Sequence, residues 1–188
     1  AFLSSYNMYL GVQPGLQYQY KNWAAAAEVA FPLFYKTKND LEKDQYHRFG
    51  LEVKKYRSKT FATAKRYHSL QVNYAIRNFY KITTGSFQER TTDDSTSVYD
   101  KAKIHSPVLT VALKTGRTYQ LKKGFVLDVF AGVGLRRIAT SYSDVLNLRR
   151  DRYGRKDLTP FPPSAYKYDL TLTRLHATAG MRLGIQIK

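Results

Sequence analysis

The chain has 188 residues and carries 31 Lys and Arg against 14 Asp and Glu, which gives a formal net charge of +17. That length suits a single domain, residues 1–188, and an apolar content of 43% excludes wholesale disorder. The lack of Cys excludes a disulfide scaffold, a thiolate metal site and a Cys nucleophile. The longest apolar stretch, Trp23 to Tyr35, is shorter than the roughly 20 residues of a transmembrane helix and contains Glu28 and Pro32. Composition leaves two classes: a nucleic-acid-binding protein, or a membrane protein without membrane-spanning helices.

Apolar and polar residues alternate along most of the chain, which is the period of β-strands. In residues 125–140, for example, Leu127, Val129 and Val133 alternate with Asp128 and Gly132. The same alternation predicts eight strands, at residues 6–12, 16–21, 28–33, 49–54, 69–77, 109–119, 125–140 and 166–187.

The connections between these strands predict the topology. Pro14 and Gly15 suit the central positions of a type II turn between the first two strands. From the second hairpin onward, short connections alternate with long ones, of which the longest are residues 83–104 and 141–163. This alternation predicts an all-β fold, an eight-stranded antiparallel up-and-down transmembrane barrel with both termini at its plain rim. In the last strand the apolar positions change from even to odd numbers, which predicts a β-bulge near Thr173 or Arg174.

The second face of the predicted strands indicates where the core lies. A soluble barrel buries its apolar face, whereas a membrane barrel turns that face outward. Here the second face combines glycines, small polar residues and charges of both signs, which suits a crowded interior better than a solvated surface. We therefore favour the membrane barrel over the soluble one. Because buried charges must be paired, we expect an interior network of Glu28, Glu52, Lys54, Arg77, Lys114, Asp128, Arg136 and Arg182.

Three segments carry a resemblance to one group of proteins. They are the hairpin of residues 110–136, residues 48–56 with Glu52 and Tyr56 at the matching positions, and the closing residues 180–187. Together they are similar to small outer-membrane β-barrels of OmpA/OmpX-like architecture, including a Bacteroidota-type family of unknown function. The resemblance implies insertion by the outer-membrane assembly machinery and a place in the cell outer membrane after removal of a signal peptide. It implies no activity.

Much of the surplus positive charge lies in loops. Five basic residues crowd the loop of residues 141–163: Arg149, Arg150, Arg152, Arg155 and Lys156. If this loop is extracellular, these residues face the phosphates of lipopolysaccharide, which arginine binds through bidentate contacts. A solvated basic loop without a ligand explains the same residues equally well.

Two other classes remain as alternatives. The charge of +17 with interleaved tyrosines suits a nucleic-acid-binding protein, although the basic residues lie in loops and the strand faces are apolar. A lipid-modifying barrel enzyme would need a His beside a Ser and a carboxylate. His176 faces the interior by its parity, and a structural imidazole is the simpler interpretation of it.

The sequence thus predicts a non-enzymatic outer-membrane protein with a filled polar interior and without a cofactor or metal. We expect its partners to be outer-membrane lipids, lipopolysaccharide and other outer-membrane proteins, and we expect no nucleic acid among them. The expected role is that of a structural or accessory subunit of a larger outer-membrane complex, or of a binder that acts through its loops.

Overall fold

The computed structural model describes residues 2–3, 8–9, 11–32, 43–57, 64–81, 85–89, 96–151, 168–169 and 171–185. Most of these residues are in β-strands, and the helical element among them is one 3-10 turn, Lys122–Gly124. All strand pairs but one, β15 with β8, are antiparallel. The prediction of an all-β fold is confirmed.

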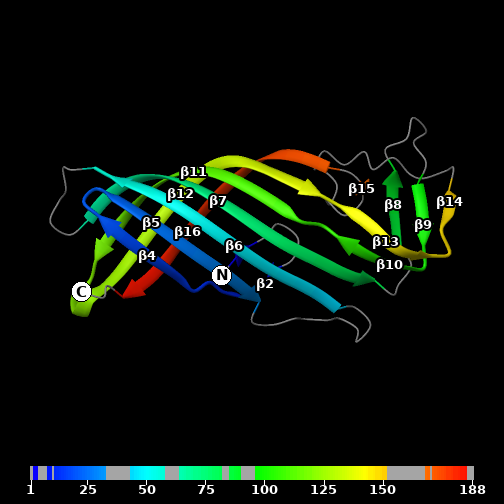
Figure 1. Ribbon diagram of the computed structural model, residues 1–188, viewed down its shortest axis with the longest axis horizontal. Helices are drawn as coiled ribbons and strands as arrows, with labels where there is room; N and C mark the ends of the chain where they lie inside the picture. The colour runs from blue at the N-terminus through cyan, green and yellow to red at the C-terminus, as the bar shows by residue number, and fades with distance from the viewer. Residues whose placement is uncertain are drawn as a thin grey trace.

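One long sheet forms most of the molecule (Figure 1). Its strands follow in the order β16, β12, β11, β7, β6 and β5, and β3 and β4 both pair with the outer edge of β5. The bounds are β3 (Gly11–Val12), β4 (Gly15–Tyr20), β5 (Trp23–Pro32), β6 (Lys43–Tyr56), β7 (Ala64–Lys81), β11 (Val108–Gln120), β12 (Phe125–Ala139) and β16 (Thr171–Ile185). The connections β4–β5 and β11–β12 are short and lie at the same end of the sheet, which we call the short-turn end (Figure 1).

Shorter strands extend the other end of the sheet (Figure 1). There β10 (Lys101–His105) pairs with β7 and with β13 (Ser141–Leu146). A second sheet contains β14 (Arg149–Asp151), β9 (Thr96–Tyr99), β8 (Gly85–Glu89) and β15 (Tyr168–Asp169), and β1 (Phe2–Leu3) pairs with β2 (Met8–Tyr9). The two segments predicted as long loops, residues 83–104 and 141–163, therefore contain strands.

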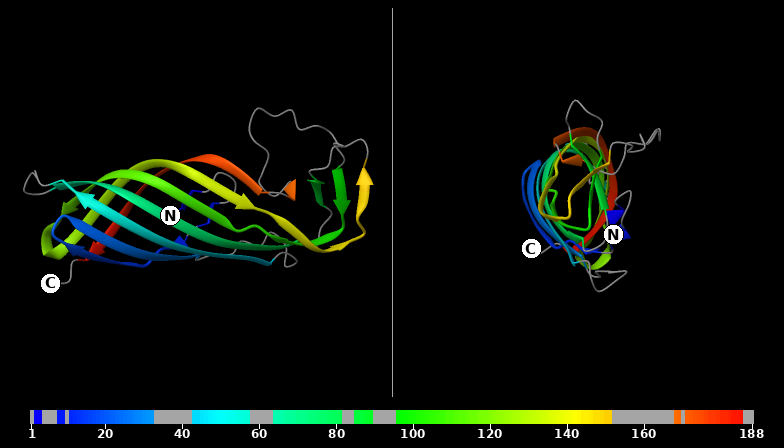
Figure 2. Two further views of the ribbon diagram at one scale, coloured as in Figure 1. Left: turned by 45° about the horizontal axis from the view of Figure 1, so that its top comes forward. Right: turned by 90° about the vertical axis from the view of Figure 1, so that its right-hand side faces the viewer.

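The long sheet curls until its two ends approach each other (Figure 2). In a flat sheet β16 and β5 would lie about 24 Å apart, because five ladder steps of about 4.8 Å separate them. Yet the Arg182 guanidinium on β16 forms an ion pair with the Glu28 carboxylate on β5. Among the described residues no backbone ladder joins the edge strands β4 and β16, so contact across the gap is made by side chains.

The predicted turn at Pro14 and Gly15 is wrong. Gly11 pairs with Pro32 and Gly15 with Glu28, in one uninterrupted register, and the Val29 amide donates to the Pro14 carbonyl over 3.0 Å. Residues 11–20 therefore form a single edge strand, because proline at a sheet edge removes only one ladder hydrogen bond. The described sheet is consequently seven strands wide, and β4 and β16 run in the same direction.

The predicted β-bulge near Thr173 or Arg174 is also absent from the described part of β16. The pairing of β12 with β16 runs without a shift from Ala139 opposite Thr171 to Phe125 opposite Ile185. Leu172 faces inward and lies opposite Ile138, which packs in an interior apolar cluster with Ala75 and Val108. The apolar residues change from even to odd positions near Leu172 because the inward face of the sheet is apolar at that height. The strand itself stays regular.

The sheet buries its polar face and exposes its apolar face. Glu52 and Lys114 are among the most deeply buried side chains, whereas Leu113, the neighbour of Lys114 on β11, is 67% exposed. Between the two apolar ends of the interior, one at Tyr56 and Tyr67 and the other around Ile138, the inside is lined largely by charged and amide side chains. This inversion of the usual distribution is the feature that defines the candidate site.

Candidate functional site: a buried charge cluster beneath an exposed apolar belt

Arg182 is the centre of the buried charge cluster. Its Nη1 lies 2.6 Å from Glu52 Oε2 and 3.7 Å from Asp128 Oδ2, and its Nη2 contacts Glu28. These three carboxylates come from β6, β12 and β5, so one guanidinium from β16 bridges strands from both halves of the sheet. A planar guanidinium with several donors suits such a multiple contact, which an ammonium could make less well.

Two lysines complete the cluster. Lys54 Nζ lies 2.6 Å from Asp128 Oδ2, and Lys114 Nζ lies 2.8 Å from Glu52 Oε1. Hydroxyl and amide donors satisfy further carboxylate oxygens: Ser69 donates to Glu52 over 2.6 Å, Gln71 to Glu28 over 3.3 Å, and Thr118 to Asp128 over 3.4 Å. Three carboxylates thus face three cations, and this balance is what allows ions to remain buried.

Aromatic rings pack against the cations of the cluster. Lys54 Nζ lies 4.6 Å from the centre of the Tyr67 ring, and Lys114 Nζ lies 4.2 Å from that of Phe130. Arg182 also stacks on Phe130, at 4.6 Å. Gly116 makes room for these rings, since a Cβ at this position would lie 2.5 Å from the Tyr67 Cζ and Oη atoms. Cation–π contact adds to the ion pairs where solvent is excluded.

Six of the eight residues expected in the interior network therefore meet in this cluster: Glu28, Glu52, Lys54, Lys114, Asp128 and Arg182. Arg77 lies elsewhere, because its Nε and Nη2 donate to the carbonyl and hydroxyl oxygens of Ser106 at 2.8 and 2.9 Å. Arg136 faces inward as expected, but it lies opposite Arg174 in the β12–β16 ladder and further from the short-turn end. Parity alone gives the face of a residue, and it does not give its height along the strand.

The cluster contains contributors that the sequence analysis did not single out. Ser69, Gln71, Tyr67 and Phe130 all contact its charged groups. The signal that could have found them is the same alternation that identified the charges, because each lies on the inward parity of its strand. Alternation singles out charged residues more readily than neutral ones, since only a buried charge requires a partner of opposite sign.

Arrangements that would indicate chemistry are not formed by the described residues. In this part of the chain no three His, Asp or Glu side chains gather as metal ligands, and the carboxylates of the cluster are held by cations. His176 lies opposite Gly134, and no hydrogen bond joins it to a serine or carboxylate within the described ranges. The ion pairs of the cluster join β5, β6, β11, β12 and β16, so the arrangement can hold these strands together electrostatically.

The basic loop is described only in part. Arg149 Nη2 lies 3.0 Å from Asp100 Oδ1, and the Asn147 amide donates to Asp100 Oδ2 over 2.9 Å. The Asn147 hydrogen bond and the Arg149 charge hold the pKa of the Asp100 carboxyl below its usual value. Arg150 lies on β14 opposite Ser97. Arg152, Arg155 and Lys156 lie outside the described residues.

The outward face forms an apolar belt around the sheet. Its largest members, all at least 38% exposed, include Leu16, Tyr18, Phe49, Leu51, Val53, Leu70, Val72, Tyr74, Leu109, Val111, Leu113, Val129, Val133, Leu135, Leu175, Met181 and Leu183. On β6 the belt runs from Phe49 to Val53 and is bordered by His47 and Lys55, which are also exposed. On β12 the belt runs from Phe125 to Leu135, which is about 34 Å along the strand. For a strand tilted by about 40° from the barrel axis, this length corresponds to about 26 Å along that axis.

None of the helical structure described here is long and apolar enough to cross a bilayer. Compared with known protein families, with curated proteins and with solved structures, the chain matches none.

Proposed function

We propose that this chain is an integral β-barrel protein of an outer membrane, with a filled polar interior and no catalytic role. The observation that carries the proposal is the inverted burial: leucine and valine side chains cover the outside, while six charged groups are neutralised inside. A contiguous exposed apolar surface of this extent is unfavourable in water and marks contact with lipid or protein. The height of the belt on β12 is close to the apolar band of about 25 Å that transmembrane barrels present.

The proposed barrel has an eighth strand between β16 and β4. In a bilayer each backbone N–H and C=O needs a partner within the protein, so the edges of a spanning sheet must be paired. Because β4 and β16 run in the same direction, one additional strand can lie antiparallel to both. This placement preserves the all-antiparallel pattern of the long sheet and supports the eight-stranded count.

The proposed role is that of a structural or accessory subunit that acts through its surfaces. The interior carboxylates are occupied by cations, so the chain offers its belt, its rims and its loops to partners. Outer-membrane lipids and other outer-membrane proteins would meet the belt. Lipopolysaccharide phosphates would meet the basic loop that begins with Arg149 and Arg150 on β14, at the end away from the short turns (Figure 1). The exposed faces of the central strands carry leucine and valine where a nucleic-acid-binding sheet would carry basic and aromatic residues.

A lysine placed in the belt tests the proposal. We expect Leu113→Lys to destabilise the protein folded into phospholipid vesicles by about 2–4 kcal/mol, because Leu113 faces outward in the belt and a charge there meets hydrocarbon. Ser143→Lys is the matched control, since Ser143 is exposed on β13 beyond the belt. Stability would be followed by guanidinium unfolding, with Trp23, the single tryptophan, as the fluorescent reporter. Equal stability of the two variants would overturn the proposal.

A further inference from the structure

The outward face of β5 is lined by small residues, unlike those of its neighbours. It presents Ala25 and Ala27, whereas β4 presents Leu16 and Tyr18, and β6 presents Leu51 and Val53 at the corresponding height. The alanines therefore form the floor of a groove that runs along β5 between two walls of large side chains. A strand with alanine at these positions leaves room above its backbone that an apolar group can fill.

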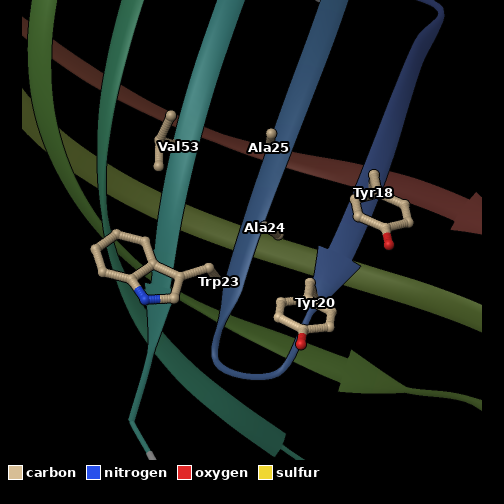
Figure 3. Close-up of a pocket in the computed structure, with 6 residues that line it drawn as sticks. All are labelled: Tyr18, Tyr20, Trp23, Ala24, Ala25 and Val53. Carbon is tan, nitrogen blue, oxygen red and sulfur yellow. The ribbon is translucent and has the colours of Figure 1, made fainter.

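A hollow lies in the groove next to the β4–β5 turn (Figure 3). This hollow of about 170 Å³ is lined by Tyr18, Tyr20, Trp23, Ala24, Ala25 and Val53, and the exposed surface of its lining is apolar. Trp23 and Val53 lie on one side of Ala25 and the two tyrosines on the other (Figure 3). A hollow of this volume and chemistry suits a segment of a single hydrocarbon chain.

Two lysines stand at the mouth of the groove. Lys21 Nζ lies 5.2 Å from the centre of the Tyr20 ring, and Lys55 Nζ lies 5.2 Å from that of Trp23. Tyr20, Trp23 and Lys55 occupy one register level across β4, β5 and β6. The cations therefore lie at the head of the apolar groove, where the belt ends and a lipid headgroup region would begin.

We propose that this groove binds one acyl chain of an anionic glycerophospholipid whose phosphate contacts Lys21 and Lys55. The inference rests on the proposed function, since it needs the belt to face lipid. Charge complementarity selects the occupant: an uncharged apolar helix or strand from a partner protein would leave the two lysines unused. The aromatic rings of Tyr20 and Trp23 support the lysines and suit the boundary between hydrocarbon and headgroups.

Native mass spectrometry of the detergent-purified chain, residues 1–188, tests the site. The probes are palmitoyl-oleoyl phosphatidylglycerol and the zwitterionic phosphatidylcholine with the same acyl chains. We expect retention of one phosphatidylglycerol in preference to phosphatidylcholine. Each of Lys21→Ala and Lys55→Ala should weaken phosphatidylglycerol binding about fivefold, which is the effect of one basic residue near an anionic lipid surface. Arg117→Ala is the matched control, because Arg117 is an exposed cation near the short-turn end away from the alanine floor, and it should leave binding unchanged.

A second variant separates the groove from its charges. Ala25→Trp fills the hollow without altering a charge, and it should reduce the binding of both lipids; Ala25→Leu serves if the larger residue impairs folding. Two results would overturn the site. One is that Arg117→Ala weakens phosphatidylglycerol binding as much as Lys21→Ala or Lys55→Ala does. The other is that Ala25→Trp and the double variant Lys21→Ala/Lys55→Ala both bind lipid as well as the wild type does. If Leu113→Lys still destabilises the protein in vesicles, either result would overturn the lipid-binding inference alone and leave the proposed membrane barrel standing. Tolerance of Leu113→Lys would overturn the proposed function as well.

Discussion

Glu52 is the residue on which the buried cluster depends most directly. It forms an ion pair with Lys114, accepts hydrogen bonds from Arg182 and from the Ser69 hydroxyl, and its side chain is fully buried. Removing its charge would leave two cations with less compensation inside the sheet, and breaking a buried ion pair from one side costs several kcal/mol.

We predict that Glu52→Gln lowers the free energy of unfolding by about 3–5 kcal/mol. Asp144→Asn is the matched control: Asp144 Oδ2 also lies 2.5 Å from a lysine Nζ, that of Lys103, but this pair is exposed and screened by solvent. The control should unfold at the same denaturant concentration as the wild type. Guanidinium titration of the protein in vesicles measures both, and a Glu52→Gln protein as stable as the wild type would show that the cluster contributes little.

At the scale of the elements, the edge strand of residues 11–20 shows what sequence patterns can and cannot tell. Alternation correctly predicted that residues on both sides of Pro14 are extended. Alternation could not tell a turn from a strand that continues past a proline, because Pro followed by Gly suits both. The contact that decides between them is the pairing of Pro14 with Val29, which is a long-range contact. Similarly, alternation placed Glu52 and Lys114 on one face, whereas the height that separates Arg136 from them depends on ladder register.

We predict that Pro14→Val changes the stability of the protein by less than about 1 kcal/mol. The valine supplies an N–H opposite Val29, which is worth about 1 kcal/mol, and this offsets the greater freedom that it gives the unfolded chain, about 0.4–1 kcal/mol. A chain turning at Pro14 would instead lose the residue that sets its turn. The same unfolding titration distinguishes the two, and a loss of several kcal/mol would contradict the continuous strand.

At the scale of the whole molecule, the strands and the cluster stabilise each other. The long sheet is held by ladders from β16 to β5, and the contact from Arg182 to Glu28 spans the gap between its ends. Opening such a structure requires ladders and buried ion pairs to break together, so we expect slow unfolding with a high barrier.

This barrier predicts heat-modifiable migration on a gel. Unheated protein in dodecyl sulfate should migrate as a compact species, and boiled protein at the position of its unfolded mass, 21.7 kDa. Because Glu52→Gln removes ion pairs from the interior, this variant should change from the compact to the unfolded species at a lower temperature than the wild type. Asp144→Asn should change at the same temperature as the wild type. Identical migration before and after boiling, in a protein that stays soluble without detergent, would contradict a closed membrane barrel.

The position of Arg182 also has a consequence for the order of folding. This residue lies on β16, the last strand of the long sheet, while the acids that it neutralises lie on β5, β6 and β12. Until β16 is in place, Lys54 and Lys114 are the two cations in contact with the carboxylates of the cluster, and Glu28 lacks its ion pair with Arg182. Docking of β16 therefore supplies the third cation of the cluster, so the arginine couples the arrival of this strand to the burial of acids that come much earlier in the chain.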